Sequence, residues 1–164
     1  RLSKLARGDY AAIVGAMSRR PPASYVDTCV LVSLFHGDSG YGAAEAWLRA
    51  AADQELWISH WVLLEFASAT AVRLRRGDLA IARAAALQSA LEAFRQERLA
   101  MLEPRGEDFL MARRWIETGD AAALRAADGL HLAMAHRQGL RLVSADQLLV
   151  RAAHSLGIDA GLVA

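Results

Sequence analysis

Four carboxylates each stand as the only formally charged residue in an apolar stretch of the chain. They are Asp27, Glu65, Asp128 and Asp146. Burying an unpaired carboxylate costs several kcal/mol, and like charges close together push one another toward protonation. A hard divalent cation such as Mg²⁺ or Mn²⁺ removes both problems, because it prefers oxygen ligands, keeps several waters and is commonly shared with a substrate phosphate. These residue types therefore indicate metal-assisted hydrolysis of phosphodiester bonds, with one or two ions.

The elements predicted around these residues place them at one edge of a sheet. Asp27 and Asp146 fall at the carboxyl ends of predicted strands, whereas Glu65 and Asp128 fall within the first two turns of predicted helices. In a parallel sheet each crossover helix begins near the carboxyl edge of the preceding strand, and ligands bind at that edge. We therefore expect all four carboxylates to converge there.

Short β-rich runs alternate with longer alanine-rich helical runs, which predicts an α/β fold with a short parallel sheet of four or five strands wrapped by helices. The predicted strands are SYVDTCV (24–30), ELWIS (55–59), LAMLEP (99–104), LRLVS (140–144) and a weaker fifth near 158–163. The predicted helices span 43–52, 61–75, 79–98, 108–118, 122–138 and 145–156. Gly77 is expected to end one helix and Asp78 to cap the next, which makes residues 61–98 a helical hairpin.

Length and composition exclude several classes of protein. The 164 residues suit one domain, and 54% hydrophobic with 23% charged residues excludes a disordered chain. Charged residues interrupt every apolar run, so no membrane-spanning segment is expected. The single cysteine, Cys29, excludes an internal disulfide and a cysteine-based zinc cluster, which suits the cytoplasm.

The first part of the chain differs from the rest in charge. Five basic residues against one acid give residues 1–24 a net charge of +4, which leaves −3 for residues 25–164. The sequence Arg-Arg-Pro-Pro stands near the end of this segment, and its prolines stop any helix. We expect residues 1–24 to be a basic tail or an upstream fragment, and residues 25–164 to be the domain.

The carboxylates also have ordinary structural interpretations. An aspartate after a strand can simply cap the following helix, and this alternative stays open for Asp27 and Asp146. Ser144 can itself be the N-cap, which would leave Asp146 as a first-turn acid favoured by the helix dipole. Asp128 can pair with Arg125, three residues before it.

Three stretches resemble PIN-domain ribonucleases, especially VapC-type toxins of toxin–antitoxin pairs: YVDTCVLVSLF, WVLLEFASA and LRAADGLHLAMAHRQGLRLVSADQLL. The resemblance covers about residues 25–163 and implies a Mg²⁺- or Mn²⁺-dependent endoribonuclease that is silenced by a cognate antitoxin. It places the family's acidic quartet on the four carboxylates already named, and its hydroxyl positions, for substrate or phosphate positioning, on Thr28 and Ser144. Many relatives carry threonine where Ser144 stands, and the basic tail is not part of the family's domain.

On this basis we assign Asp27 and Asp128 as the main metal ligands, Glu65 as a ligand or a water-orienting base, and Asp146 as a second-site or outer ligand. The 61–98 hairpin is expected to offer apolar surface for a homodimer or an antitoxin helix, and an antitoxin is expected to insert an arginine or lysine among the carboxylates. Two alternatives stay open: an inactive PIN-like binding module whose acids hold an ion or a partner's arginine, and a nuclease acting on DNA.

Two further residues lie close to the quartet in sequence. His131 follows Asp128 by three residues on the same side of a predicted helix, and we expect it to be structural; the alternative is contact with substrate or with an outer water. Cys29 is expected on the same strand face as Asp27, in the core and without a base nearby.

Overall fold

The structure is a computed structural model that describes residues 23–121 and 124–164. The prediction of a separate basic segment over residues 1–24 therefore lies outside the described residues, apart from its last two positions, which begin the first strand. The strands are β1 (Ala23–Val26), β2 (Glu55–Ser59), β3 (Leu99–Leu102), β4 (Arg141–Ser144) and β5 (Ala160–Leu162). They form one sheet in the order β3-β2-β1-β4-β5, and every pairing is parallel.

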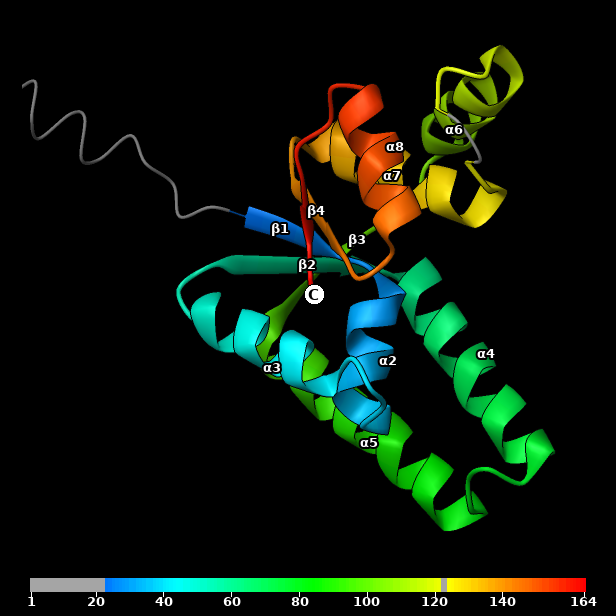
Figure 1. Cartoon of the computed structure of the whole chain (residues 1–164). Helices are drawn as coiled ribbons and strands as arrows, with labels where there is room; N and C mark the ends of the chain where they lie inside the picture. The colour runs from blue at the N-terminus through cyan, green and yellow to red at the C-terminus, as the bar shows by residue number, and fades with distance from the viewer. Residues whose placement is uncertain (1–22, 122–123) are drawn as a thin grey trace, which may run out of the picture.

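Helices connect the strands and cover both faces of the sheet. They are α2 (Thr28–His36), α3 (Tyr41–Ala50), α4 (His60–Arg76), α5 (Ile81–Arg98), α6 (Gly106–Thr118), α7 (Ala126–Gln138) and α8 (Gln147–Ser155). Helices α2 to α5 lie on one side of the sheet, whereas α7 and α8 lie on the other and α6 packs against α7 (Figure 1). The predicted α/β fold with a parallel sheet wrapped by helices is confirmed. None of the helices within residues 23–121 and 124–164 combines the length and apolarity needed to cross a membrane.

The strand order shows where a site can form. The chain moves outward from the central β1 to β2 and β3, then returns to place β4 on the other side of β1. The strand order reverses at β1, and ligands of open parallel sheets bind outside the carboxyl ends of the strands at such a point. Residues that follow β1, β2 and β4 therefore face a common edge.

The predicted strand over residues 24–30 is wrong beyond Val26. Asp27 occupies the N-cap position of α2 with extended backbone (φ −70°, ψ 151°), and the apolar run after it is helical. Short apolar runs rich in β-branched residues suit a buried strand and a buried helix equally well, so the pattern alone did not separate them. Gly37, which ends α2 in the left-handed conformation (φ 68°), is the signal that would have revealed the helix.

Two glycines show how the helices are ended and packed: Gly77 at the end of α4 and Gly129 within α7. The 61–98 hairpin is present and α4 ends at Gly77, but the predicted cap at Asp78 is wrong: α5 begins at Ile81 after the N-cap residue Ala80, without a side-chain cap. In α7, Gly129 is a poor helix former that the packing requires. A Cβ at this position would lie 3.2 Å from Ala112 Cβ on α6, so glycine lets the two helices approach closely.

Candidate active site

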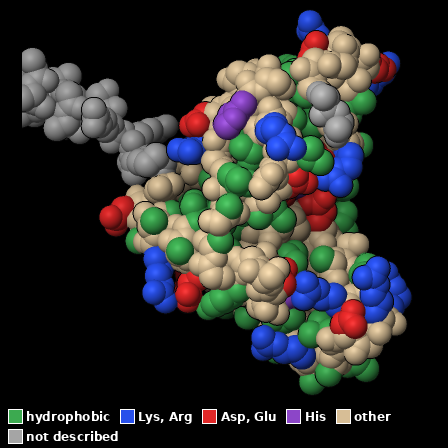
Figure 2. Space-filling model, in the orientation of Figure 1, with side chains coloured by type: hydrophobic (Ala, Val, Ile, Leu, Met, Phe, Trp, Pro, Cys, Tyr) green, Lys and Arg blue, Asp and Glu red, His purple; other side chains and the backbone are tan. Residues whose placement is uncertain are grey.

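A cleft at the carboxyl edge of the sheet contains all four predicted carboxylates. Its volume is about 400 Å³, and the side chains lining it include Asp27, Glu65, Asp128 and Asp146. Acidic side chains gather in a hollow between the helices above and below the sheet (Figure 2). The sequence placed these residues far apart, and the fold brings them together as expected.

Asp27 is held by the end of β4 and by its own helix. Its backbone N–H donates to Val143 O (2.9 Å), which extends the β1–β4 pairing past the end of β1. Its Oδ2 accepts hydrogen bonds from Ser144 Oγ (2.6 Å) and Cys29 Sγ (3.0 Å). The carboxylate is almost fully buried, and its Oδ1 accepts no hydrogen bond from the described residues. One oxygen is therefore fixed by the protein and the other faces the cleft centre.

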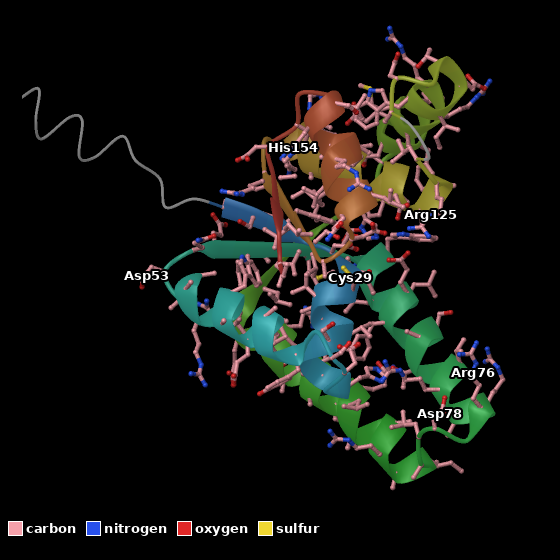
Figure 3. All side chains as sticks on the ribbon, viewed as in Figure 1. Cys29, Asp53, Arg76, Asp78, Arg125 and His154 are labelled. Carbon is pink, nitrogen blue, oxygen red and sulfur yellow. The ribbon has the colours of Figure 1, made fainter. Side chains whose placement is uncertain are left out.

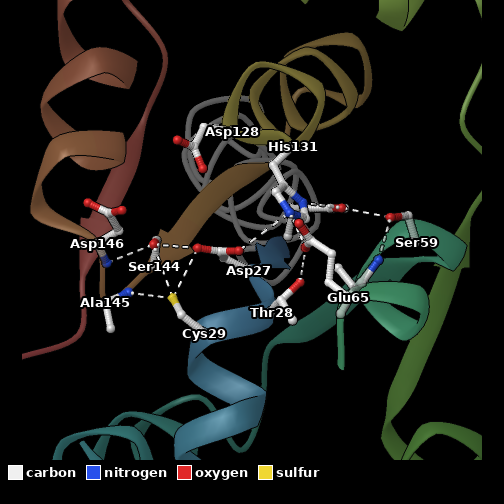
Figure 4. A network of polar contacts seen from close by, with 12 residues as sticks. Asp27, Thr28, Cys29, Ser59, Glu65, Asp128, His131, Ser144, Ala145 and Asp146 are labelled. Atoms are coloured by element: carbon white, nitrogen blue, oxygen red, sulfur yellow. Dashed lines mark hydrogen bonds and ion pairs between the residues drawn. The ribbon is translucent and has the colours of Figure 1, made fainter. Parts of the chain in front are cut away.

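Glu65 and His131 form the other wall of this half of the cleft. Glu65 Oε2 lies 2.8 Å from His131 Nε2 and also accepts a hydrogen bond from Thr28 Oγ1. The same His131 nitrogen lies 3.5 Å from Asp27 Oδ1. One ligand atom each of Asp27, Glu65 and His131 lies within 4.8 Å of the others, which is close enough for a shared metal ion (Figure 4).

The surroundings of these groups shift two pKa values. Burial alone would raise the pKa of Glu65, but the hydrogen bond and charge of His131, together with the Thr28 hydroxyl, lower it overall. Burial likewise disfavours a charged His131, but the hydrogen bond to Glu65 and the charges of Asp27, Glu65 and Asp128 raise its pKa overall. The two groups stabilise each other's charged forms.

Arg125 bridges the other two carboxylates. Its Nε lies 2.7 Å from Asp128 Oδ2, and its Nη2 lies 2.9 Å from Asp146 Oδ2. The sequence left an Asp128–Arg125 pair open, and the structure contains that pair. The Arg125 side chain is 68% exposed and contacts one oxygen of each aspartate. Asp128 Oδ1 accepts no hydrogen bond from the described residues.

Asp146 and Ser144 differ from the simplest prediction. Asp146 is itself the N-cap of α8, because its Oδ1 accepts from the backbone N–H groups of Leu148 (2.7 Å) and Leu149 (3.3 Å). The alternative in which Ser144 caps this helix is therefore wrong. Ser144 is fully buried, and its hydroxyl donates to Asp27 and accepts from the Asp146 N–H (2.9 Å). Ser144 thus links Asp27 to the backbone of Asp146 on the buried side of both residues, and it does not line the cleft.

Cys29 and His131 contact the quartet more closely than sequence reasoning predicted. Cys29 lies on α2, not on a strand, and donates to Asp27. Burial first and the Asp27 charge second raise the pKa of its thiol to about 12. His131 is as buried as a structural histidine but contacts two of the four acids. Its position one turn after Asp128 was the only signal for this in the sequence.

The donor set suits a hard divalent cation. Five carboxylates line the cleft, the four predicted ones and Asp38, whose partner is Arg73 at 3.5 Å. The lining contains only one guanidinium and one imidazole, so negative charge is in excess. Oxygen atoms of Asp27 and Asp128 remain without hydrogen-bond partners among the described residues. Oxygen-rich sites with spare carboxylate atoms bind Mg²⁺ or Mn²⁺ and leave room for waters and a substrate phosphate.

The sequence matches one family model over most of its length. The model of the PIN domain matches residues 24–155. The chain belongs to the PIN-domain family. Domains of this family are generally nucleases. The cleft of this PIN domain contains the four carboxylates that the sequence singled out. No curated protein sequence matches the chain.

Solved structures share the fold of this PIN domain. VapBC2 from Rickettsia felis, bound to a DNA fragment from its promoter, matches with a TM-score of 0.64 and 14% identity, over 85% of this chain and 98% of that chain. FitAcB from Neisseria gonorrhoeae matches with a TM-score of 0.61 and 19% identity, over 83% and 94%. VapC20 from Mycobacterium tuberculosis, a toxin that cleaves the sarcin–ricin loop, matches with a TM-score of 0.54 and 21% identity, over 72% and 85%. At these identities the likeness concerns the fold.

Proposed function

We propose that this PIN domain is a metal-dependent endoribonuclease and the toxin component of a cytoplasmic toxin–antitoxin pair. The observation that carries the proposal is the gathering of Asp27, Glu65, Asp128 and Asp146 in one cleft, where oxygen atoms of Asp27 and Glu65 lie within 4.8 Å of each other. The family match and the fold shared with the VapBC2 and FitAcB structures support it.

The residues of the cleft have different roles in the proposed hydrolysis. When bound, Mg²⁺ or Mn²⁺ supplies an activated water and stabilises charge that builds up on the phosphate. Asp27 and Asp128, each with an oxygen free of hydrogen bonds among the described residues, are the main ligands. Glu65 is a ligand or orients the attacking water. Asp146, with one oxygen spent on the α8 cap, is the outer ligand.

The two hydroxyl residues act at different distances from the substrate. Thr28 lines the cleft and donates to Glu65, so it both holds that carboxylate and can contact an RNA phosphate. Ser144 lies behind Asp27 and Asp146, and we assign it to positioning these carboxylates instead of the substrate. Arg125 is exposed at the cleft, and its guanidinium can exchange its aspartate partners for an RNA phosphate.

The test is cleavage of a panel of structured RNAs, including a sarcin–ricin loop, by the purified full chain with Mg²⁺, with Mn²⁺ and with chelator. We expect cleavage only with metal, and a loss of orders of magnitude in Asp128→Asn. Asp53→Asn is the matched control, because Asp53 is an exposed aspartate at the opposite end of the sheet from Arg125 (Figure 3). Cleavage that is insensitive to chelator would contradict the mechanism. Faster cleavage of single-stranded DNA than of RNA would favour a DNA-acting nuclease.

One observation favours the second candidate function, an inactive binding module. Arg125 already pairs with Asp128 and Asp146, as a partner's arginine would in such a module. A binding module has no metal-dependent cleavage to lose, so wild type and Asp128→Asn would be equally inactive in the RNA assay. The excess of carboxylates over cations in the cleft is the reason we prefer the enzyme.

The expected partners are a cognate antitoxin and a second copy of the chain. Large apolar side chains are exposed on the predicted hairpin at Leu64 and Ile81, but more of them lie on α6: Phe109, Leu110, Met111 and Ile116. A cavity of about 660 Å³ between α6, α7 and Trp61 of α4 is lined mainly by apolar side chains. Apolar grooves of this kind accept amphipathic helices. Light scattering of the purified chain, alone and with its antitoxin, tests both partners.

A further inference from the structure

His131 lies among the carboxylates of the cleft although it is not one of the four residues assigned to the acidic quartet. It lies on α7 one turn after Asp128, and only 1% of its surface is exposed. Its Nε2 contacts Glu65, and its Nδ1 lies 2.9 Å from the Tyr25 hydroxyl on β1. The imidazole therefore connects the buried centre of the sheet to the cleft.

These contacts belong to a ring that consists of hydrogen bonds and is closed by the backbone of α4 between Ser59 and Glu65. The Tyr25 hydroxyl also lies 2.8 Å from Ser59 Oγ, and Ser59 is the N-cap of α4, where it accepts from Val62 N–H (3.4 Å). Helix α4 also carries Glu65. The ring therefore contacts this helix twice, at its N-cap Ser59 and, through His131, at Glu65. The position of Glu65 is thus fixed against both β1 and α7.

The direction of the hydrogen bonds assigns the proton on His131. A carboxylate can only accept hydrogen bonds, and Glu65 Oε2 already accepts one from Thr28 Oγ1. Nε2 of His131 must therefore carry a proton in order to contact Glu65 at 2.8 Å. A nitrogen that carries a proton has no free lone pair for a metal ion, so this contact makes His131 a holder of Glu65 instead of a ligand.

We propose that His131 is a positioning residue that orients Glu65 for metal binding and thereby sets the affinity of the cleft for divalent cations. The proposal rests on the metal-dependent function proposed above. Both His131 and Thr28 donate to the same oxygen, Oε2, which restricts rotation of the carboxylate. Groups that hold metal ligands in this way typically contribute about 10- to 100-fold to metal affinity.

Two amide substitutions test the contacts of the two imidazole nitrogens separately, that of Nε2 with Glu65 and that of Nδ1 with Tyr25. The amide nitrogen of Gln reaches the position of Nε2, whereas that of Asn reaches the position of Nδ1. His131→Gln should retain the contact with Glu65 and bind Mn²⁺ within a few-fold of wild type. His131→Asn should lose that contact and bind Mn²⁺ about 10- to 100-fold more weakly. The measurement is the Kd for Mn²⁺ by isothermal titration calorimetry on the full chain, freed of metal by chelator.

The outcomes distinguish this inference from the function on which it rests. If wild type binds no Mn²⁺, the proposed function fails and takes the inference with it. If wild type binds Mn²⁺ but His131→Gln loses as much affinity as His131→Asn, or neither loses any, the positioning role alone is overturned.

Thermal unfolding in chelator shows whether both variants are folded. Should the His131→Asn chain fail to fold, Tyr25→Phe replaces it as the test. This change keeps the ring in the core and removes only the hydroxyl that fixes the imidazole. We expect a weaker Mn²⁺ affinity in Tyr25→Phe, and an unchanged affinity would contradict the proposal.

Discussion

Two arginine–aspartate clusters lie at opposite ends of α7 and use the same residue types differently. In the last turn, Arg137 contacts both oxygens of Asp108 on α6 (2.7 and 3.0 Å), and the Arg105 N–H donates to the same carboxylate (2.8 Å). At the start of the helix, Arg125 contacts one oxygen each of Asp128 and Asp146. The first cluster is buried and its hydrogen bonds are satisfied, whereas the second is exposed and adjoins further carboxylates.

The comparison shows that pairing with arginine does not by itself distinguish structure from function. The Arg137 cluster has one buried carboxylate for one guanidinium, and that carboxylate is 1% exposed. The lining of the cleft has five carboxylates, the predicted four and Asp38, for one guanidinium and one imidazole. An excess of negative charge, not the presence of an ion pair, marks the site that needs a cation.

The largest expected effect is on activity in the cleft. Asp27→Asn keeps the size of the side chain and its hydrogen bond with Ser144 but removes one ligand charge. We expect the rate of metal-dependent RNA cleavage to fall at least about 100-fold. Thermal unfolding in chelator should stay the same or shift upward, because repulsion between the carboxylates falls. Equal activity losses in Asp27→Asn and the control Asp53→Asn would contradict this prediction.

The opposite pattern is expected in the balanced cluster. Arg137→Ala leaves Asp108 buried without its partner, so we expect the free energy of unfolding to fall by about 2 kcal/mol. Denaturant unfolding measures the loss. Cleavage per folded molecule should be retained at temperatures well below the transition. A stable variant without activity would show that this cluster, too, belongs to the site.

Asp146 both caps helix α8 and contributes a charge to the cleft, and two substitutions separate these roles. Asp146→Ala removes the α8 cap and should cost about 1 kcal/mol of unfolding free energy. Asp146→Asn keeps a good cap and should be close to wild type in stability while losing part of its activity. Denaturant unfolding and cleavage rates are measured on both variants. Equal stability of the two would show that the cap does not stabilise the helix.

Arg125 should matter little for stability. Its side chain is 68% exposed, so Arg125→Ala should change the unfolding free energy by less than about 1 kcal/mol. Removing this competing positive charge should tighten Mn²⁺ binding, whereas removing a structural bridge would destabilise the chain. Urea unfolding and a Mn²⁺ titration distinguish the two results.

The lowered pKa of Glu65 gives a smaller, pH-dependent effect. A carboxyl group with a pKa below its ordinary value of 4.5 stabilises the fold above that pH, and the contribution disappears as pH falls through the lowered pKa. In chelator, the stability difference between wild type and Glu65→Gln should therefore be full between about pH 4.5 and 6.5, shrink below this range as Glu65 is protonated, and shrink above it as His131 loses its proton. A difference that does not vary with pH would contradict the pairing of Glu65 with His131.

Much of this architecture could be predicted from the sequence because its signals are local. Alternating strand and helix patterns predicted the parallel sheet, and isolated carboxylates at strand ends and helix starts predicted which side chains would share the cleft. What could not be predicted depends on long-range contacts. The ring through Tyr25 and His131 joins residues 106 positions apart, and nothing local marks it.

Helix α2 and the balanced cluster show the same limit. The apolar run after Asp27 suits a strand or a helix, and apart from Gly37 at its end no local signal separates the two. Asp108 is a helix-start acid among other charges in the sequence, so its burial against Arg137 could not be foreseen. Local patterns locate groups of one charge, whereas the balance of charges in space needs the fold.

Electron paramagnetic resonance of free Mn²⁺ tests the central claim most directly, because it counts bound metal without any substrate. The account predicts saturable binding by the chelator-treated wild type and by Asp53→Asn, and binding at least about 100-fold weaker in Asp27→Asn. Wild type that leaves all Mn²⁺ free in solution, or binding that survives unchanged in Asp27→Asn, would contradict the claim that these carboxylates are gathered to hold a divalent cation.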